Sequence, residues 1–209
     1  TIVEDRGDGN EKVYKKTLRT LPVDNLDRAD DGIKISDLVG ENAAIAVEDA
    51  VKETLRNLSG RTIEIENINE QEQNFSLFRK TGHWFFKGRL NYVMDGQNSY
   101  TDFNINVLPP SNMVAYDTLH IPWTYLKDKI PEASDIYTSP NRDIAVVLTG
   151  DEILVFEIGR GNTLEGLLTT ISLSRGSSVI MAEWATGDYV LNWEKSFIKN
   201  NDAKQYFKN

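Results

Sequence analysis

The sequence predicts an α+β protein in which helices pack on antiparallel, meander-type β-sheets, with about eight strands and three helices. Two observations lead to this class. Apolar residues recur at helical spacing in separate segments, and the runs between these segments alternate apolar and polar residues. The expected order is a helix, a group of strands, a short helix, a second group of strands and a helix. Strands and helices do not alternate one by one, as they would in a parallel sheet.

The first helix is expected over residues 41–58. Val47, Val51 and Leu55 recur at a spacing that places them on one side of a helix. Gly60 follows, and glycine suits the left-handed conformation with which many helices end. We therefore expect an amphipathic helix whose apolar side packs on a sheet.

Strand-like runs follow this helix and are joined by short turns. They span residues 61–68, 74–80, 83–94 and 100–108. In the clearest run, Trp84, Phe86 and Tyr92 fall on one face. Lys87 and Arg89 fall on the other face. This alternation predicts an antiparallel meander with one apolar face and one face in contact with water.

The second group begins with a short helix within residues 122–130, because Pro122 suits a first helical position. Two hairpins are then expected, from strands at residues 143–148, 153–158, 167–173 and 179–185. The chain ends in a helix over 189–199, where Val190, Trp193 and Phe197 share one side. Either Thr186 or Asp188 is expected to cap it.

These elements divide the chain into three parts. Residues 1–34 are mostly polar and are expected to form a leader or tail with a loop. Residues 35–110 hold the first helix and its meander, and residues 111–209 hold the short helix, the two hairpins and the C-terminal helix. The last two parts either form separate domains or share one core.

Charge and composition exclude several function classes. The chain carries 32 acidic and 23 basic side chains, for a net charge of -9, which opposes binding to nucleic acid. It has no cysteine, so thiol catalysis, disulfides and thiolate zinc sites are excluded. No run of about 18 apolar residues occurs, so we expect no transmembrane segment.

Residues with catalytic or metal-binding chemistry form no recognisable motif. His83 and His120 are the only histidines and lie far apart in the sequence. The acidic residues between Asp24 and Asp31 do not match a calcium-binding loop, because Leu38 stands where a bidentate Glu is required. We therefore predict no catalytic residue, no metal ligand and no cofactor, and the sequence identifies no ligand-binding residue.

Two weaker patterns do not predict a site. Glu183 and Asp188 are a conceivable carboxylate pair for glycoside hydrolysis, but sequence does not place them at the distance which that reaction needs. The aromatic residues are expected mainly in the core, although exposed rings also bind sugars and peptides.

Our leading expectation for function is a non-catalytic extracytoplasmic binding or interaction module of a bacterial cell envelope, secreted or held at the surface like a lipoprotein. Its partner would be a protein or a cell-wall component, and a cytoplasmic location is the alternative. A second hypothesis is a small-ligand-binding or hydrolytic domain with a pocket in the curved sheet around Trp84, Phe86 and Tyr92. A third is a structural or assembly component. Composition does not set the oligomeric state.

Overall fold

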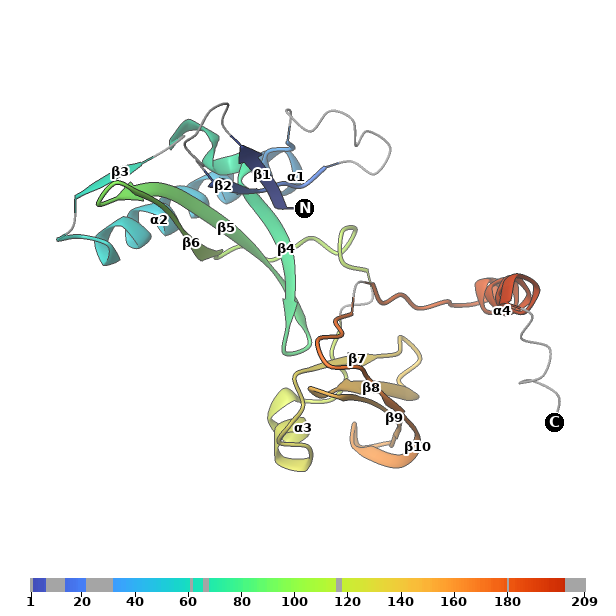
Figure 1. Cartoon of the computed structure of the whole chain (residues 1–209). Helices are drawn as coiled ribbons and strands as arrows, with labels where there is room; N and C mark the ends of the chain where they lie inside the picture. Colours follow the sequence, from blue (N-terminus) through green and yellow to red (C-terminus); the bar gives the residue numbers. More distant parts are fainter. Residues whose placement is uncertain are drawn as a thin grey trace. The chain divides into compact units, whose positions relative to one another are not determined.

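The protein was analysed as a computed structural model, which describes residues 2–6, 14–21, 32–60, 62–65, 68–115, 118–179 and 181–201. The chain divides into two compact units, residues 1–115 and 116–209 (Figure 1). Each unit contains an antiparallel sheet and helices, so the predicted α+β class with antiparallel sheets is confirmed. The described residues hold ten strands and four α-helices, somewhat more than the sequence predicts.

The sheet of the first unit is built around β5 (His83–Met94). Strand β6 (Gln97–Ile105) pairs with it along its length, and β4 (Phe75–Lys80) and β3 (Ile63–Ile65) pair with opposite ends of it. Asp95 and Gly96 connect β5 to β6, both with positive φ, as expected for a two-residue hairpin turn. Strands β4, β5 and β6 pair in chain order, as the predicted meander requires, whereas β3 pairs with β5 rather than with β4.

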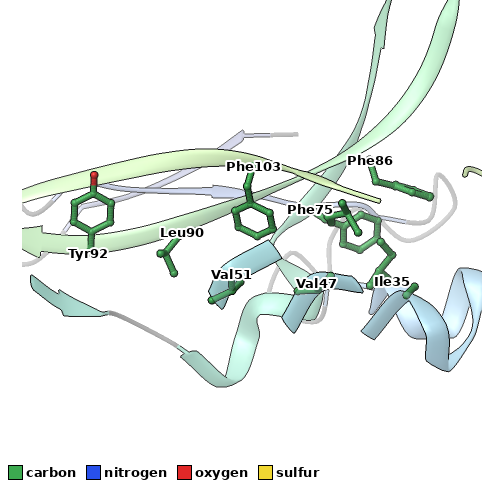
Figure 2. Close-up of a cluster of buried hydrophobic side chains, with 10 residues drawn as sticks. Ile35, Val47, Val51, Phe75, Phe86, Leu90, Tyr92 and Phe103 are labelled. Atoms are coloured by element: carbon green, nitrogen blue, oxygen red, sulfur yellow. The ribbon is translucent and has the colours of Figure 1, made fainter. Parts of the chain in front are cut away.

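Helix α2 (Glu41–Asn57) covers one face of this sheet, preceded by the short helix α1 (Ile35–Val39). Figure 2 shows Val47 and Val51 of α2 directed toward Leu90 and Phe103 of the sheet. Phe86 is fully buried in the same cluster, where its ring meets the ring of Phe75 edge-on. A pocket was predicted around Trp84, Phe86 and Tyr92. Core packing fills the space at Phe86 and Tyr92, because α2 brings its apolar side onto that face, and Trp84 lies outside this cluster.

The other face of the sheet is less exposed to water than the sequence predicts. A hairpin of β1 (Ile2–Arg6) and β2 (Tyr14–Leu18) lies within the segment predicted as a polar leader, and β2 contacts β4, β5 and β6. As a result Leu18 is buried, and so are Arg89 and Asn91. The prediction of a wet face is wrong at these positions because β2, distant in sequence, covers them.

The second unit contains a four-stranded sheet in the order β10-β9-β8-β7. The strands span Asp135–Thr138 (β7), Ile144–Leu148 (β8), Glu152–Ile158 (β9) and Leu164–Ser172 (β10). Helix α3 (Trp123–Lys129) packs on this sheet, and its Leu126 joins Ile136 and Val147 in a second hydrophobic core. The strands form one continuous meander, whereas the sequence predicted two separate hairpins.

Further differences from prediction concern single elements. No strand forms at the described residues of 179–185, so that prediction is wrong, and β7 is a strand that was not predicted. Helix α4 (Asp188–Asn201) is present where a C-terminal helix was expected. The short η1 helix (Ile68–Gln73) of the first unit was likewise not predicted.

Candidate interaction surface

Helix α4 has an apolar stripe that no described part of the chain buries. Asp188 lies in its first turn and Lys199 in its last, where each charge complements the helix dipole. Helical geometry places Tyr189, Val190 and Trp193 within one side. Tyr189 is 66% exposed and Trp193 is 45% exposed. The stripe therefore has the composition of a packing face, yet it remains open to solvent.

Exposed apolar side chains are concentrated in this part of the molecule. Among the described residues, ten of the thirteen large hydrophobic side chains that are exposed lie between residues 164 and 201. They are Leu167, Leu168, Ile171, Val179, Met181, Tyr189, Val190, Leu191, Trp193 and Phe197. Single exposed apolar residues are ordinary, whereas a contiguous group of them marks an interaction surface. Several of these residues are neighbours on α4, so this helix is the strongest candidate for a functional surface.

Strand β10 contributes to the same segment as an edge strand. Its ladder with β9 is irregular between Leu164 and Thr169 and regular from Thr169 to Ser172. Leu167 and Ile171 are each about half exposed. An edge strand of this length leaves unpaired backbone groups that a further strand can use.

Two grooves in the first unit offer smaller surfaces. One, of about 460 Å³, lies between α2 and η1 and is lined mainly by apolar groups, including Ile45 and Leu55. The other, of about 340 Å³, runs between α2 and the free edge of β6 and is lined by polar groups such as Glu53 and Asn104. The first groove includes Val47, Val51 and Leu55, which the sequence identified only as the apolar side of a helix, and the second includes no residue that the sequence suggested as a site.

A buried ion pair lies beneath β2, on the side of the sheet away from α2. The Nε and Nη2 atoms of Arg89 donate to the two carboxylate oxygens of Asp102 at 2.6 and 3.0 Å. The guanidinium also stacks over the ring of Tyr100 at 4.0 Å. Nη1 of Arg89 is buried and has no hydrogen-bond partner among the described residues. The arrangement fixes β5 against β6, with the guanidinium buried and the carboxylate in part exposed to solvent.

The residues weighed for catalysis do not come together. His83 is exposed at the start of β5, and His120 lies in the second unit, where its backbone N–H donates to the hydroxyl of Thr138. Burial, and then the nearby charge of Arg142, lower the pKa of His120 below its ordinary value. In the part of the chain that the structure describes, no three His, Cys, Asp or Glu side chains are placed to hold a metal ion. The acidic residues Asp24 to Asp31 lie outside the described residues.

The carboxylates and aromatic residues are distributed between surface and core. Glu183 and Asp188 are both exposed. Trp84 is half buried and lies under the guanidinium of Arg79. Trp123 packs against the core of the second unit, as expected of most aromatic residues. The aromatic residues of α4 and Tyr100 of β6 are exposed instead. The spacing of those on α4 was visible in the sequence, although their exposure was not.

Comparison with known proteins does not assign this surface. No protein-family model, curated protein or solved structure matches the chain. Among the described residues, every helix is too short or too polar to cross a membrane. The candidate surface must therefore be interpreted from its own geometry and composition.

Proposed function

We propose that this chain is an extracytoplasmic interaction module of a bacterial cell envelope, which binds a partner protein through the apolar stripe of α4. The observation that carries the proposal is the exposure of Tyr189, Val190 and Trp193 along one side of a single amphipathic helix. Such a helix binds by laying its apolar side into a groove of another protein. Trp and Tyr are also the residues that contribute most often to binding hot spots.

Burial energetics support a role in binding. Covering a large apolar side chain is worth about 1.5–3 kcal/mol, so leaving several of them in water forgoes stabilisation that the fold could otherwise gain. A partner that covers the stripe recovers this free energy at the interface. The same reasoning favours an interaction module over an independent enzyme, because the exposed residues are apolar rather than reactive.

The cellular location in this proposal rests on composition. The chain has no cysteine and a net charge of -9. Absence of cysteine suits an oxidising exterior in organisms that rarely use disulfides, and the acidic surface suits contact with proteins rather than with polyanions.

The proposal is tested by capture from envelope extracts with two matched variants. Trp193→Glu places a negative charge in the stripe, and Asn192→Glu adds the same charge at an exposed position outside it. We expect the unmodified chain and the Asn192 variant to retain the same partner, and the Trp193 variant to retain it about tenfold less well or worse. Both variants should unfold like the unmodified chain, because neither site is buried.

Three results would each overturn part of the proposal. Equal capture by the Trp193 and Asn192 variants, or no capture by the unmodified chain, would remove the role of α4. Fractionation of the full-length gene product to the cytosol would remove the envelope location while leaving the α4 measurement valid.

A further inference from the structure

A second surface of the same unit points to a second copy of this chain. Strand β10 is one edge of its sheet, and β7, the other edge, has only four residues. We propose that β10 pairs antiparallel with β10 of a second copy, so that two four-stranded sheets join into one across a two-fold axis. This inference rests on β10 alone and does not depend on the proposed role of α4.

The backbone of β10 is oriented for such pairing. The N–H of Leu173, which continues the strand, donates to the carbonyl of Asp151 at 2.6 Å. The ladder is regular from Thr169 to Ser172, and the direction of backbone groups alternates along a strand. Thr169 and Ile171 therefore direct their backbone groups toward β9, and Thr170 and Ser172 direct theirs toward the open edge.

This orientation allows a two-fold axis at Thr170. Two copies of Thr170 would face each other and exchange two backbone hydrogen bonds, as in a hydrogen-bonded antiparallel pair. Leu167 and Ile171, which are half exposed in the single chain, would then gain neighbours from the second strand.

The absence of charge along β10 supports the same pairing. Two copies of a chain with a net charge of -9 repel each other, so a contact between them requires a neutral segment. Residues 166–174 contain no charged side chain, so two copies can approach along the regular part of β10 without bringing like charges together.

Other exposed edges suit self-pairing less well. Strand β4 ends with Arg79 and Lys80, and β6 contains Asp102, which is already paired with Arg89. Strand β10 contains no proline, lysine or arginine, the residues that commonly protect an edge from pairing. Its single acidic residue, Glu165, lies before the regular part of the strand, which begins at Thr169.

The test is sedimentation equilibrium of the full chain over a wide concentration range, with variants that separate the backbone from the charges. Thr170→Pro removes the outward N–H without touching the ladder to β9, and Thr170→Val keeps that N–H as the matched control. We expect a dimer for the unmodified chain and the Val variant, and a monomer for the Pro variant. At dilutions where all three chains are monomeric, their unfolding midpoints should be the same.

A charge placed within the neutral segment tests the pairing independently. Thr170→Glu places two like charges opposite each other at the axis, and we expect it to weaken dimerisation about tenfold. Thr170→Gln is the matched neutral control and should dimerise like the unmodified chain. A chain that is monomeric at every concentration would overturn the proposal. So would a dimer that persists in the Thr170→Pro variant, or one that the Trp193→Glu substitution alone dissociates. Capture of an envelope partner through α4 would be unaffected by these β10 variants.

Discussion

Arg89 and Asp102 lie directly opposite each other on β5 and β6 and form a two-pronged ion pair, with Nε 2.6 Å from Oδ1 and Nη2 3.0 Å from Oδ2. The side chain of Arg89 is almost completely buried, whereas that of Asp102 is 28% exposed. A buried cation without its anion is costly, so the two residues are expected to tolerate substitution differently.

Asp102→Asn should lower the free energy of unfolding by about 1–3 kcal/mol, less than a fully buried pair would lose because solvent reaches the carboxylate. The double variant Arg89→Met/Asp102→Leu should be more stable than Asp102→Asn, since it removes the buried charge together with its partner. Urea unfolding measures both. Equal stability of Asp102→Asn and the unmodified chain would contradict the role given to this pair, and Glu48→Gln, in the exposed pair with Lys52, is the control that should change little.

Asn74 should be needed to hold β2 on the sheet. Its Oδ1 accepts from the N–H of Leu18 at 2.8 Å, and its Nδ2 donates to the carbonyl of Arg89 at 2.6 Å. Asn74→Ala leaves both backbone groups buried without these partners and should lower the free energy of unfolding by about 2–3 kcal/mol. Hydrogen exchange at the Leu18 amide should accelerate, whereas the exposed Asn98→Ala should leave it unchanged. An unaltered exchange rate in the Asn74 variant would show that β2 is held by other contacts.

Gly88 should be intolerant of any side chain. A Cβ atom built at this position would overlap the ring of Phe103, which faces it across the β5–β6 ladder. We expect Gly88→Ala to lower the free energy of unfolding by about 1–3 kcal/mol through overpacking. Phe103→Leu frees the space. The double variant should therefore lose less free energy of unfolding than the sum of the two single variants, by about 1 kcal/mol or more. Additive losses would mean that Phe103 is not what excludes the side chain.

His120 should make the protein less stable in mild acid. Its pKa in the folded state lies below the ordinary value of 6.5, because burial and then Arg142 disfavour the charged form. As the pH falls below 6.5, the unfolded chain takes up a proton before the folded chain does, so the free energy of unfolding decreases until the folded pKa is reached. Urea titrations across this range should show that the free energy of unfolding decreases more steeply with falling pH for the unmodified chain than for His120→Asn. Parallel curves, or a gain in stability in acid, would contradict this assignment.

Residue periodicity was sufficient to predict the elements that form each core. Val47 and Val51 on α2, and the alternation of Phe86 and Leu90 on β5, reflect the local geometry of a helix and a strand, so the pattern determines them. The covering of Arg89 was not predictable in this way. It depends on β2, whose packing against β5 is a long-range contact that no local pattern records.

The candidate surface was visible in part. The sequence identified the stripe of Val190 and Trp193 but assigned such residues to the core. An amphipathic helix indicates that its apolar side is covered, but it does not indicate whether the same chain or a partner covers it. The expected strand at 179–185 was wrong for a related reason. Its residues have the right composition, yet a strand exists only where a neighbouring strand offers backbone partners.

The central claim, that the stripe of α4 is open in the isolated chain and becomes covered by a partner, is tested most directly by thiol labelling. Because the chain has no cysteine, Trp193→Cys and Asn192→Cys each carry one unique thiol. We predict that both react rapidly with a maleimide in the isolated chain, and that the captured envelope partner slows the reaction at position 193 but not at position 192. A thiol at position 193 that is already protected in dilute isolated chain, while position 192 reacts freely, would contradict the claim, because the stripe would then pack within its own chain.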